Sequence, residues 1–288
     1  MASVGEYLLS HYDTIIFPFD EYAKKSFFCI MAVKKYVVPD LSQYKEEYFV
    51  KGISLDNVIF GFHEEQFKVL LLQCRNKKNW MLPGGHVLHE EDVDDAAKRI
   101  LRDRTGLKNV YLQQFWLFGD TERSSHKVVN AAMKALQLDG ANPDWMKERF
   151  VSIGYYALVE FAKVNPNPDA LSLSCEWHDL LQLPPLIFDH QAIVEKALEQ
   201  LRYHLLYKPV GYNLLPKQFT LRQLQSIYEL ILNKKLDRPN FNRKMLSLDI
   251  LIKREKLFSG TAHKAPYLYS FHKKNYFKFL SQGFSGWF

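Results

Sequence analysis

The chain of 288 residues has few cysteines, no long apolar run and no basic leader. Its three cysteines, Cys29, Cys74 and Cys175, are scattered. An odd, widely spaced set neither forms a disulfide framework nor matches a metal-binding spacing, so we expect reduced thiols in the cytoplasm. No stretch approaches the roughly 20 apolar residues of a membrane helix, so no membrane span is expected. The N-terminus lacks a basic segment followed by an apolar run, so no signal peptide is expected.

Acidic residues are scarce in the C-terminal third. From Leu201 onwards there are 4 of the 32 Asp and Glu residues but 16 of the 38 Lys and Arg residues, a balance of +12. The first 200 residues keep 28 acidic and 22 basic residues, a balance of −6. A basic tail on a slightly acidic body indicates a polyanionic partner, although basic tails also occur for solubility alone. The length allows one large or two ordinary domains.

Residues 84–107 (GGHVLHEEDVDDAAKRILRDRTGL) read as a tight glycine turn followed by a helix. Acidic residues crowd the first turns and basic residues the last, as the helix dipole favours. Val93, Ala97 and Ile100 recur at helical spacing and predict one apolar face. Gly106 stands where a residue of positive φ ends a helix. On these features alone, the segment is an amphipathic helix.

The spacing in this segment resembles the Nudix box, Gly-x5-Glu-x7-Arg-Glu-apolar-x-Glu-Glu-x-Gly-apolar. The family's glutamate after the arginine is replaced by Ile100, and its last glutamate by Arg104. In the family's hydrolases these glutamates hold divalent cations, and Mg²⁺ needs several oxygen ligands to polarise a pyrophosphate. We therefore expect no catalytic residue, no bound metal and no cofactor. The matching positions are Gly85, Glu91, Arg99, Leu101, Gly106 and Leu107, with Asp103 in place of a glutamate.

Around the box the sequence predicts an α+β fold, a Nudix-like α/β/α sandwich with a mixed sheet, over residues 47–206. Residues 58–62 and 67–72 are expected to form a hairpin, because two β-rich runs flank a polar turn. Further strands are expected at 110–118 and 151–159, and a second helix at 191–203. Residues 1–46 form an N-terminal extension of undecided role.

An insert at residues 121–148 contains an amphipathic helix. This helix would cover the ligand pocket, meet a partner subunit or cap an exposed edge of the core. The sequence does not choose among these alternatives.

After a linker at 207–217, residues 218–288 predict a winged helix-turn-helix. Thr220 is the expected N-cap of the first helix, and a second helix begins at Arg238. Strands at 250–253 and 267–271 then flank a basic loop. In this fold the second helix contacts base edges and the wing contacts phosphates, whereas the alternative is a solvated helix face. The candidate DNA contacts are Arg238, Asn240, Asn242, Arg243 and Lys244 on the helix, and Lys253, Arg254, Lys256, His263 and Lys264 in the wing.

The two halves together resemble the Nudix-related transcriptional regulators of bacteria, with the arabinose-responsive branch as the closest match. The shared stretches lie at 94–111, 151–158, 183–190, 211–221 and 224–229. The resemblance implies a sensor domain for a small effector, a pentose or an ADP-ribose-like molecule, and a homodimer on double-stranded operator DNA. There are two alternative functions. One is a working Nudix hydrolase that acts on molecules such as ADP-ribose, and the other is a module that binds RNA.

By analogy of fold, the effector would lie between the sheet and the box helix. Glu91 and Arg99 are two turns apart and alternatively form a structural ion pair, and His190 alternatively caps the helix that follows it. Arg104 favours a phosphate, and hence ADP-ribose, over a neutral sugar. The candidate ligand-binding residues are Trp80, Glu91, Arg99, Asp103, Arg104, Trp116 and Tyr155, of which the tryptophans are alternatively core residues.

Overall fold

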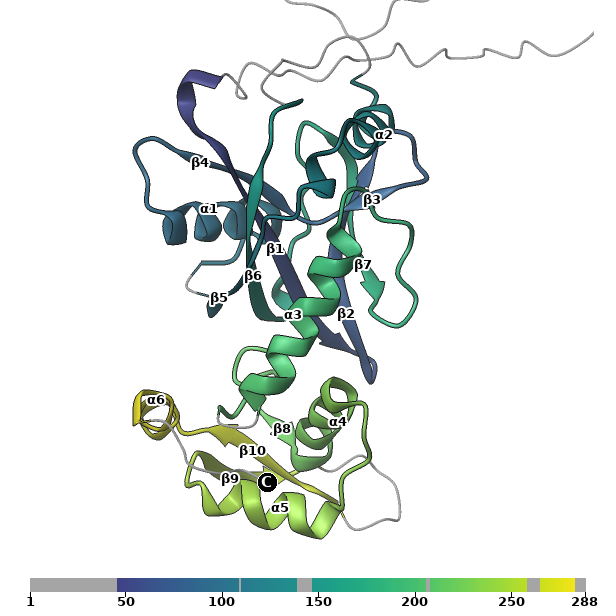
Figure 1. Cartoon of the computed structure of the whole chain (residues 1–288). Coiled ribbons are helices and arrows are strands. Elements are labelled where there is room, and N and C mark those ends of the chain that lie inside the picture. The colour runs from purple at the N-terminus through teal and green to yellow at the C-terminus, as the bar shows by residue number, and fades with distance from the viewer. Residues whose placement is uncertain (1–45, 109, 139–146, 206–207, 258–264, 283–288) are drawn as a thin grey trace, which may run out of the picture. The chain divides into compact units, whose positions relative to one another are not determined.

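The computed structural model describes residues 46–108, 110–138, 147–205, 208–257 and 265–282. Its Nudix-like part, from β1 to α3, contains a seven-stranded sheet (Figure 1). The sheet has the order β3-β2-β1-β6-β5, with β4 paired to β1 and β7 to β2. Among the described strands, β1 and β6 pair in parallel and the other pairs are antiparallel, so the sheet is mixed, as expected. The strands are β1 (Phe49–His63), β2 (Gln66–Cys74), β3 (Trp80–Met81), β4 (Gly84–Leu88), β5 (Leu112–Phe118), β6 (Val151–Glu160) and β7 (Ser172–Asp179).

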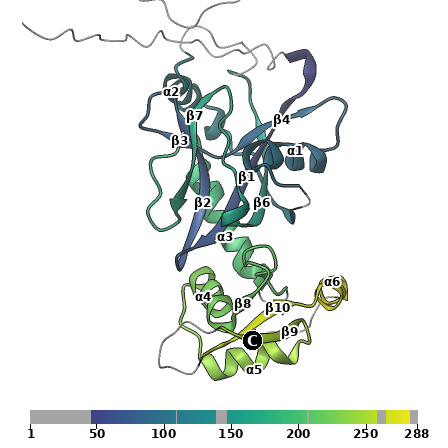
Figure 2. The ribbon, with the colours of Figure 1, turned by 180° about the vertical axis from the view of Figure 1, so that it is seen from behind.

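Helices cover both faces of this sheet. In β6, Tyr155 packs in one apolar cluster with Ala97 of α1, whereas the next residue, Tyr156, packs in another with Ile193 of α3. Because successive side chains of a strand point to opposite faces, α1 and α3 lie on opposite sides, which Figures 1 and 2 show. The predicted α/β/α sandwich is therefore present. Its helices are α1 (Val93–Thr105), α2 (His126–Leu136) and α3 (His190–Leu205), with 3-10 turns η2 (Glu46–Tyr48), η3 (Glu122–Ser124) and η5 (Phe161–Lys163).

The two ends of the box segment differ in how well the sequence predicted them. Gly106 ends α1 with φ of 71°, and its N–H donates to the carbonyl of Arg102, as expected. The tight glycine turn at Gly84 was a wrong prediction, because Gly84–Leu88 forms β4 against β1. A Cβ on Gly84 would lie 2.8 Å from the carbonyl oxygen of Leu55, so the glycine serves the close approach of two strands.

Strand β7 was not predicted from the sequence. Its buried positions are Ser172 and Cys175, whereas Leu173 is exposed, so its hydrophobic alternation is misleading. Pairing with β2 defines the strand. A local pattern alone could not show that pairing, because the partner lies about a hundred residues earlier.

The tail part, from β8 to α6, has the predicted helix, turn, helix and two-stranded wing. Thr220 caps α4 with its side chain, and Gln223 completes a capping box. Asp237 caps α5 by accepting from the N–H of Asn240. The three-stranded sheet has the order β8-β10-β9. The elements are β8 (Phe219–Thr220), α4 (Leu221–Leu232), α5 (Arg238–Ser247), β9 (Leu251–Lys256), β10 (Tyr267–Phe271) and α6 (Lys273–Gln282).

Helix α6 is an element that the sequence did not predict. The N–H of Asn275 donates to His272 Nδ1 at its start, and the buried Tyr276 donates its hydroxyl to the carbonyl of Pro209 at 2.7 Å.

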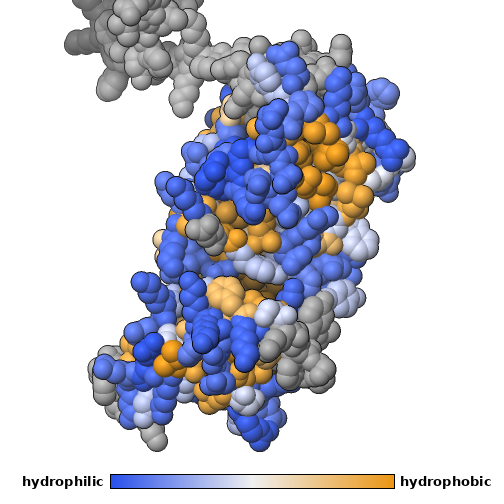
Figure 3. Space-filling model, turned by 90° about the vertical axis from the view of Figure 1, so that its left-hand side faces the viewer, coloured by the Kyte–Doolittle hydropathy of each residue, from blue (hydrophilic) through white to orange (hydrophobic). Residues whose placement is uncertain are grey.

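Figure 3 shows a largely hydrophilic surface with separate apolar patches on one side of the molecule. In the part of the chain that the structure describes, the helices are too short or too polar to span a membrane. The predicted extension 1–46 lies almost entirely outside the described residues.

Candidate functional site

A cavity of about 190 Å³ opens in the Nudix-like part. Its walls come from β1, the segment from β3 to β4, the insert and the start of α3, so that segments far apart in the sequence meet there. Both polar and apolar side chains line the cavity, among them Asp56, Arg123, Met133, Phe188 and His190.

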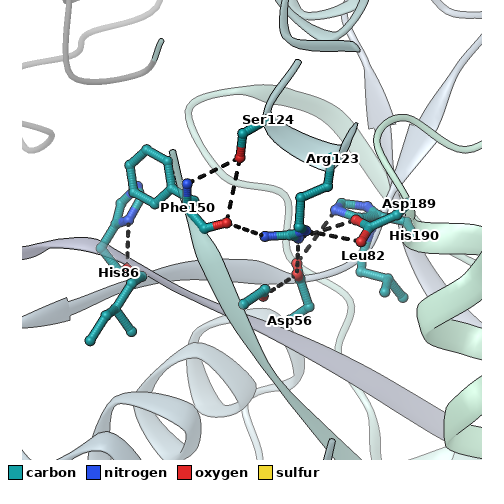
Figure 4. A network of polar contacts seen from close by, with 10 residues as sticks. Asp56, Leu82, His86, Arg123, Ser124, Phe150, Asp189 and His190 are labelled. Carbon is teal, nitrogen blue, oxygen red and sulfur yellow. Dashed lines mark hydrogen bonds and ion pairs between the residues drawn. The ribbon is translucent and has the colours of Figure 1, made fainter. Parts of the chain in front are cut away.

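Arg123 of η3 is the centre of a buried ionic network on the polar wall (Figure 4). Its Nε donates to Asp189 Oδ2 at 2.9 Å and its Nη2 to Asp189 Oδ1 at 3.1 Å. Its Nη1 donates to the carbonyl of Phe150 at 3.2 Å, and its Nη2 lies 3.7 Å from Asp56 Oδ2. The Arg123 side chain is 7% exposed. A guanidinium buried this far is tolerated only where oxygens replace its lost water, and here every nitrogen faces one.

Asp56 of β1 connects this network to α3. Its Oδ2 accepts from the hydroxyl of Ser152, and its Oδ1 lies 3.4 Å from His190 Nε2. The N–H of Leu82 donates to His190 Nδ1 at 2.9 Å, so the ring proton belongs on Nε2, facing Asp56. Burial lowers the pKa of His190, although the charge of Asp56 opposes the shift. With the imidazole neutral, the network holds two carboxylates, Asp56 and Asp189, against one guanidinium.

The apolar wall of the cavity comes from α2 of the insert. Val129, Met133 and Leu136 line the cavity. The same three side chains are buried in a cluster that contains Ile59 and Leu70 of the sheet. The insert helix therefore both covers the cavity and closes the core, which joins two of the alternatives left open by the sequence. Contact with a partner subunit stays untested.

A second charged pair lies beside the cavity. Asp169 belongs to the cavity wall, and Arg104 Nη2 lies 3.9 Å from its Oδ2. Arg104 Nη1 also donates to the carbonyl of Asn167 at 3.3 Å. Within the described part of the chain, Arg104 Nε is buried and has no hydrogen-bond partner. The guanidinium that replaces the family's last glutamate thus lies behind Asp169 and outside the cavity wall.

The predicted residues Glu91 and Arg99 form an ion pair that joins the loop before α1 to that helix. Arg99 donates from Nη2 to Glu91 Oε1 at 2.6 Å and from Nε to Oε2 at 2.9 Å. Burial raises the pKa of Glu91, but hydrogen bonds from Arg99 and the N–H of Leu88 outweigh burial and lower it overall. This geometry matches the structural alternative. Asp103, in contrast, lies near the surface beside Arg102.

The three predicted aromatic residues have different surroundings. Tyr155 is buried and donates its hydroxyl to Asp94 of α1. Trp80 is buried edge-on against His178. Trp116 is 49% exposed, with the ammonium of Lys196 at 4.2 Å from its ring. None of the seven predicted ligand-binding residues lines the cavity, and their role in binding stays a prediction.

Of the residues on the polar wall, the sequence singled out His190 alone, with capping of the next helix as an alternative role, whereas its ring accepts from the N–H of Leu82 and faces Asp56. Asp56 lies in a predominantly apolar strand, and Arg123 lies in the insert that falls outside the resemblance. Phe188 and His190 belong to a shared stretch, 183–190, so this stretch was the one available signal. Phe188 has φ of 52°, a left-handed conformation that costs a bulky residue energy and that is frequent near functional sites.

Among the described residues, no group of three or more His, Cys, Asp or Glu side chains is placed to hold a metal ion. Ile100, which replaces a glutamate, is buried against Gly85. A Cβ added to Gly85 would lie 3.1 Å from the Cδ1 of Ile100. The expectation that the chain has no metal and no cofactor stays a prediction.

Three of the five candidate DNA contacts on α5 lie on its outer side. Phe241 and Met245 are buried in the core of the tail part. Arg238, Asn240 and Arg243 are exposed, and Arg243 donates to Asn240 Oδ1. Two further candidates, Asn242 and Lys244, are half-buried, and burial lowers the pKa of Lys244.

In the wing, Lys253 and Arg254 are exposed on β9 and Lys256 is half-buried. The ammonium groups of Lys253 and Lys256 lie 3.6 and 5.3 Å from the ring of Tyr267. Arg254 donates to Ser270 Oγ across the two strands. These contacts hold the cations along one edge of the wing. His263 and Lys264 lie outside the described residues.

Comparisons with known proteins match both parts. The family model of the NUDIX domain matches residues 52–201, and that of the NrtR DNA-binding winged helix domain matches residues 211–271. The "ADPR responsive transcriptional repressor NtrR" of Acinetobacter baylyi is 31% identical over 245 residues, which cover 82% of this chain and 88% of the relative. The crystal structure of Shewanella oneidensis NrtR has a TM-score of 0.62 and 26% identity over 78% of this chain and 96% of its own. The structure of that protein with a 27mer DNA, at 24% identity, a TM-score of 0.60 and the same coverage, supports the fold alone.

Proposed function

Because the chain belongs to the NrtR-like family of regulators, which join a Nudix domain to an NrtR winged helix, we propose that it is an ADP-ribose-responsive transcriptional repressor. The observation that carries the proposal is the 31% identity to an ADP-ribose-responsive repressor over 82% of this chain. We propose the division into residues 1–46, 47–206, 207–217 and 218–288, and a homodimer on double-stranded operator DNA. The arabinose-type effector expected from the sequence finds no support in these likenesses.

The cavity suits parts of an ADP-ribose molecule. The α2 wall, with Val129 and Met133, offers apolar surface for a base, and Arg123 offers a guanidinium for a phosphate. The volume of about 190 Å³ is below the roughly 300–1,000 Å³ of typical ligand sites, so a molecule of this size requires the cavity to widen. On this proposal, binding moves side chains of the cavity wall.

Binding of ADP-ribose by the full chain is tested by titration calorimetry. L-arabinose and ribose are titrated separately as alternative effectors. A duplex recovered from a random-sequence library then serves as the operator. We expect ADP-ribose to weaken binding of this duplex, and the pentoses to leave it unchanged. If ADP-ribose neither binds nor changes the affinity for the duplex, the proposed function is wrong.

We also propose that the Nudix-like part binds ADP-ribose without hydrolysing it at a useful rate. Ile100 and Arg104 replace two metal-binding glutamates of the box, and Arg104 repels a cation. The test is the release of AMP from ADP-ribose with Mg²⁺ or Mn²⁺. Turnover that disappears in Asp103→Ala would identify a working hydrolase instead.

A further inference from the structure

Helix α3 connects the cavity with the tail part. Asp189, the residue before the helix, and His190, its first residue, belong to the network on the cavity wall. At its other end, Arg202 Nε donates to the carbonyl of Ile231 in α4 of the tail part at 2.7 Å. The hydroxyl of Tyr156 in β6 bonds to His204 and holds the same end of the helix on the sheet. The helix has 16 residues and so spans about 24 Å. A change at its start can therefore reach the tail part through one continuous element.

The start of α3 is held by residues on both sides of the cavity. The N–H of Ile187 donates to the carbonyl of Trp80, which fixes the chain up to that point. Phe188 then takes its left-handed conformation on the cavity wall, and Asp189 receives both donors of the Arg123 fork. The bidentate ion pair thus joins the insert to the start of α3. It also holds the strained turn at Phe188, which precedes the helix.

The charges of the network determine which contact gives way when an anion enters. Two carboxylates, Asp56 and Asp189, already face the single guanidinium of Arg123. A phosphate that binds Arg123 must therefore compete with one of these carboxylates for the same N–H groups. The Asp56 side chain is 8% exposed and also binds Ser152, and it faces His190. The Asp189 side chain is 24% exposed and can turn to water. Asp189 is therefore the partner that a phosphate displaces.

We infer that the Arg123–Asp189 ion pair is the element through which an anionic effector changes DNA affinity. In the ligand-free protein the pair holds the start of α3. A phosphate group of the effector takes the guanidinium, Asp189 is released, and the first turn of α3 shifts. This inference rests on the proposed function and adds the residues that couple its two sites. A neutral ligand in the same cavity leaves the pair intact and does not change DNA affinity.

The test measures ligand affinity and DNA affinity of the full chain in two variants of the pair. Asp189→Asn keeps the size of the side chain but removes its charge, and Arg123→Gln removes the guanidinium. Glu199→Gln, on the same helix but paired with Lys196 at the surface, is the matched control. The probes are ADP-ribose, neutral adenosine and the selected duplex, and thermal unfolding confirms that each variant is folded.

In the wild type, ADP-ribose is expected to weaken duplex binding by roughly 5–150-fold. In Asp189→Asn, ADP-ribose should bind more tightly, because the carboxylate of residue 189 no longer competes for Arg123, and its effect on duplex binding should fall below about twofold. Arg123→Gln should lose about tenfold or more in ADP-ribose affinity, because a charged hydrogen bond is lost. The two variants should change ADP-ribose affinity in opposite directions, whereas simple loss of structure would lower the affinity in both.

Two results would overturn the inference while leaving the proposed function in place. One is an Asp189→Asn variant that retains the wild-type response to ADP-ribose. The other is adenosine binding that weakens duplex affinity as strongly as ADP-ribose does. A wild type that does not respond to ADP-ribose at all would instead refute the proposed function.

Discussion

The polar wall of the cavity and the outer side of α5 use the same kinds of residue in opposite surroundings. Arg123 is buried, and each of its nitrogens faces an oxygen of the protein. Arg238 and Arg243 are exposed, and acidic residues are scarce throughout the tail. Buried charges depend on one another, because desolvation is costly unless every member is paired. Exposed cations cost little to keep in water and are available to phosphates, which carry most of the affinity for DNA.

The largest effect is expected where a buried partner is removed. Asp56→Ala leaves Ser152 and His190 without their acceptor and removes one of the two carboxylates beside the buried Arg123, so the free energy of unfolding should fall by about 3–5 kcal/mol. Arg238→Ala, at an exposed position, should change it by less than about 0.5 kcal/mol. Urea denaturation of both variants measures the contrast. Equal effects in the two variants would remove the distinction between the two regions.

An intermediate effect is expected on DNA binding. If Arg243 contacts a base, Arg243→Ala should cost about 1–3 kcal/mol and relax the preference at one position of the duplex. Arg222→Ala, an exposed arginine on α4, is the control. Affinity is measured by fluorescence anisotropy at several salt concentrations, where the wild type should show a slope of roughly −0.9 per neutralised phosphate. If Arg222→Ala loses as much specificity as Arg243→Ala, α5 is not the reading helix.

The smallest effect is expected from pH. Burial lowers the pKa of His190 from 6.5 in the folded protein, so the unfolded chain takes up this proton first as pH falls. The stability linked to His190 is therefore fully present above pH 6.5 and is lost as pH falls below that value. His190→Gln should flatten this part of the stability curve, whereas His89→Gln, at an exposed position, should not. Unchanged slopes in His190→Gln would show that the imidazole is not held neutral.

The cap residues and the box ion pair show what could be predicted locally. Gly106 ends α1 and Thr220 begins α4 as expected, because each depends on backbone groups within a few residues. Glu91 and Arg99 are eight positions apart in the box, so their pairing could also be read from spacing. The site on the cavity wall gave no such signal, since Asp56, Arg123 and Asp189 belong to three separate segments.

Patterns in the amino-acid sequence were enough to predict the two-part architecture, the box helix with its altered glutamates, and the polar and basic residues of α5. Each of these depends on periodicity, capping or composition within one segment. Three other features could be seen only in the folded chain: Gly84 lies in a strand, α2 covers the cavity, and Arg123 binds Asp189. These features arise where long-range strand pairing and packing bring distant segments together, and a buried charge acquires its role from the partners that replace its water.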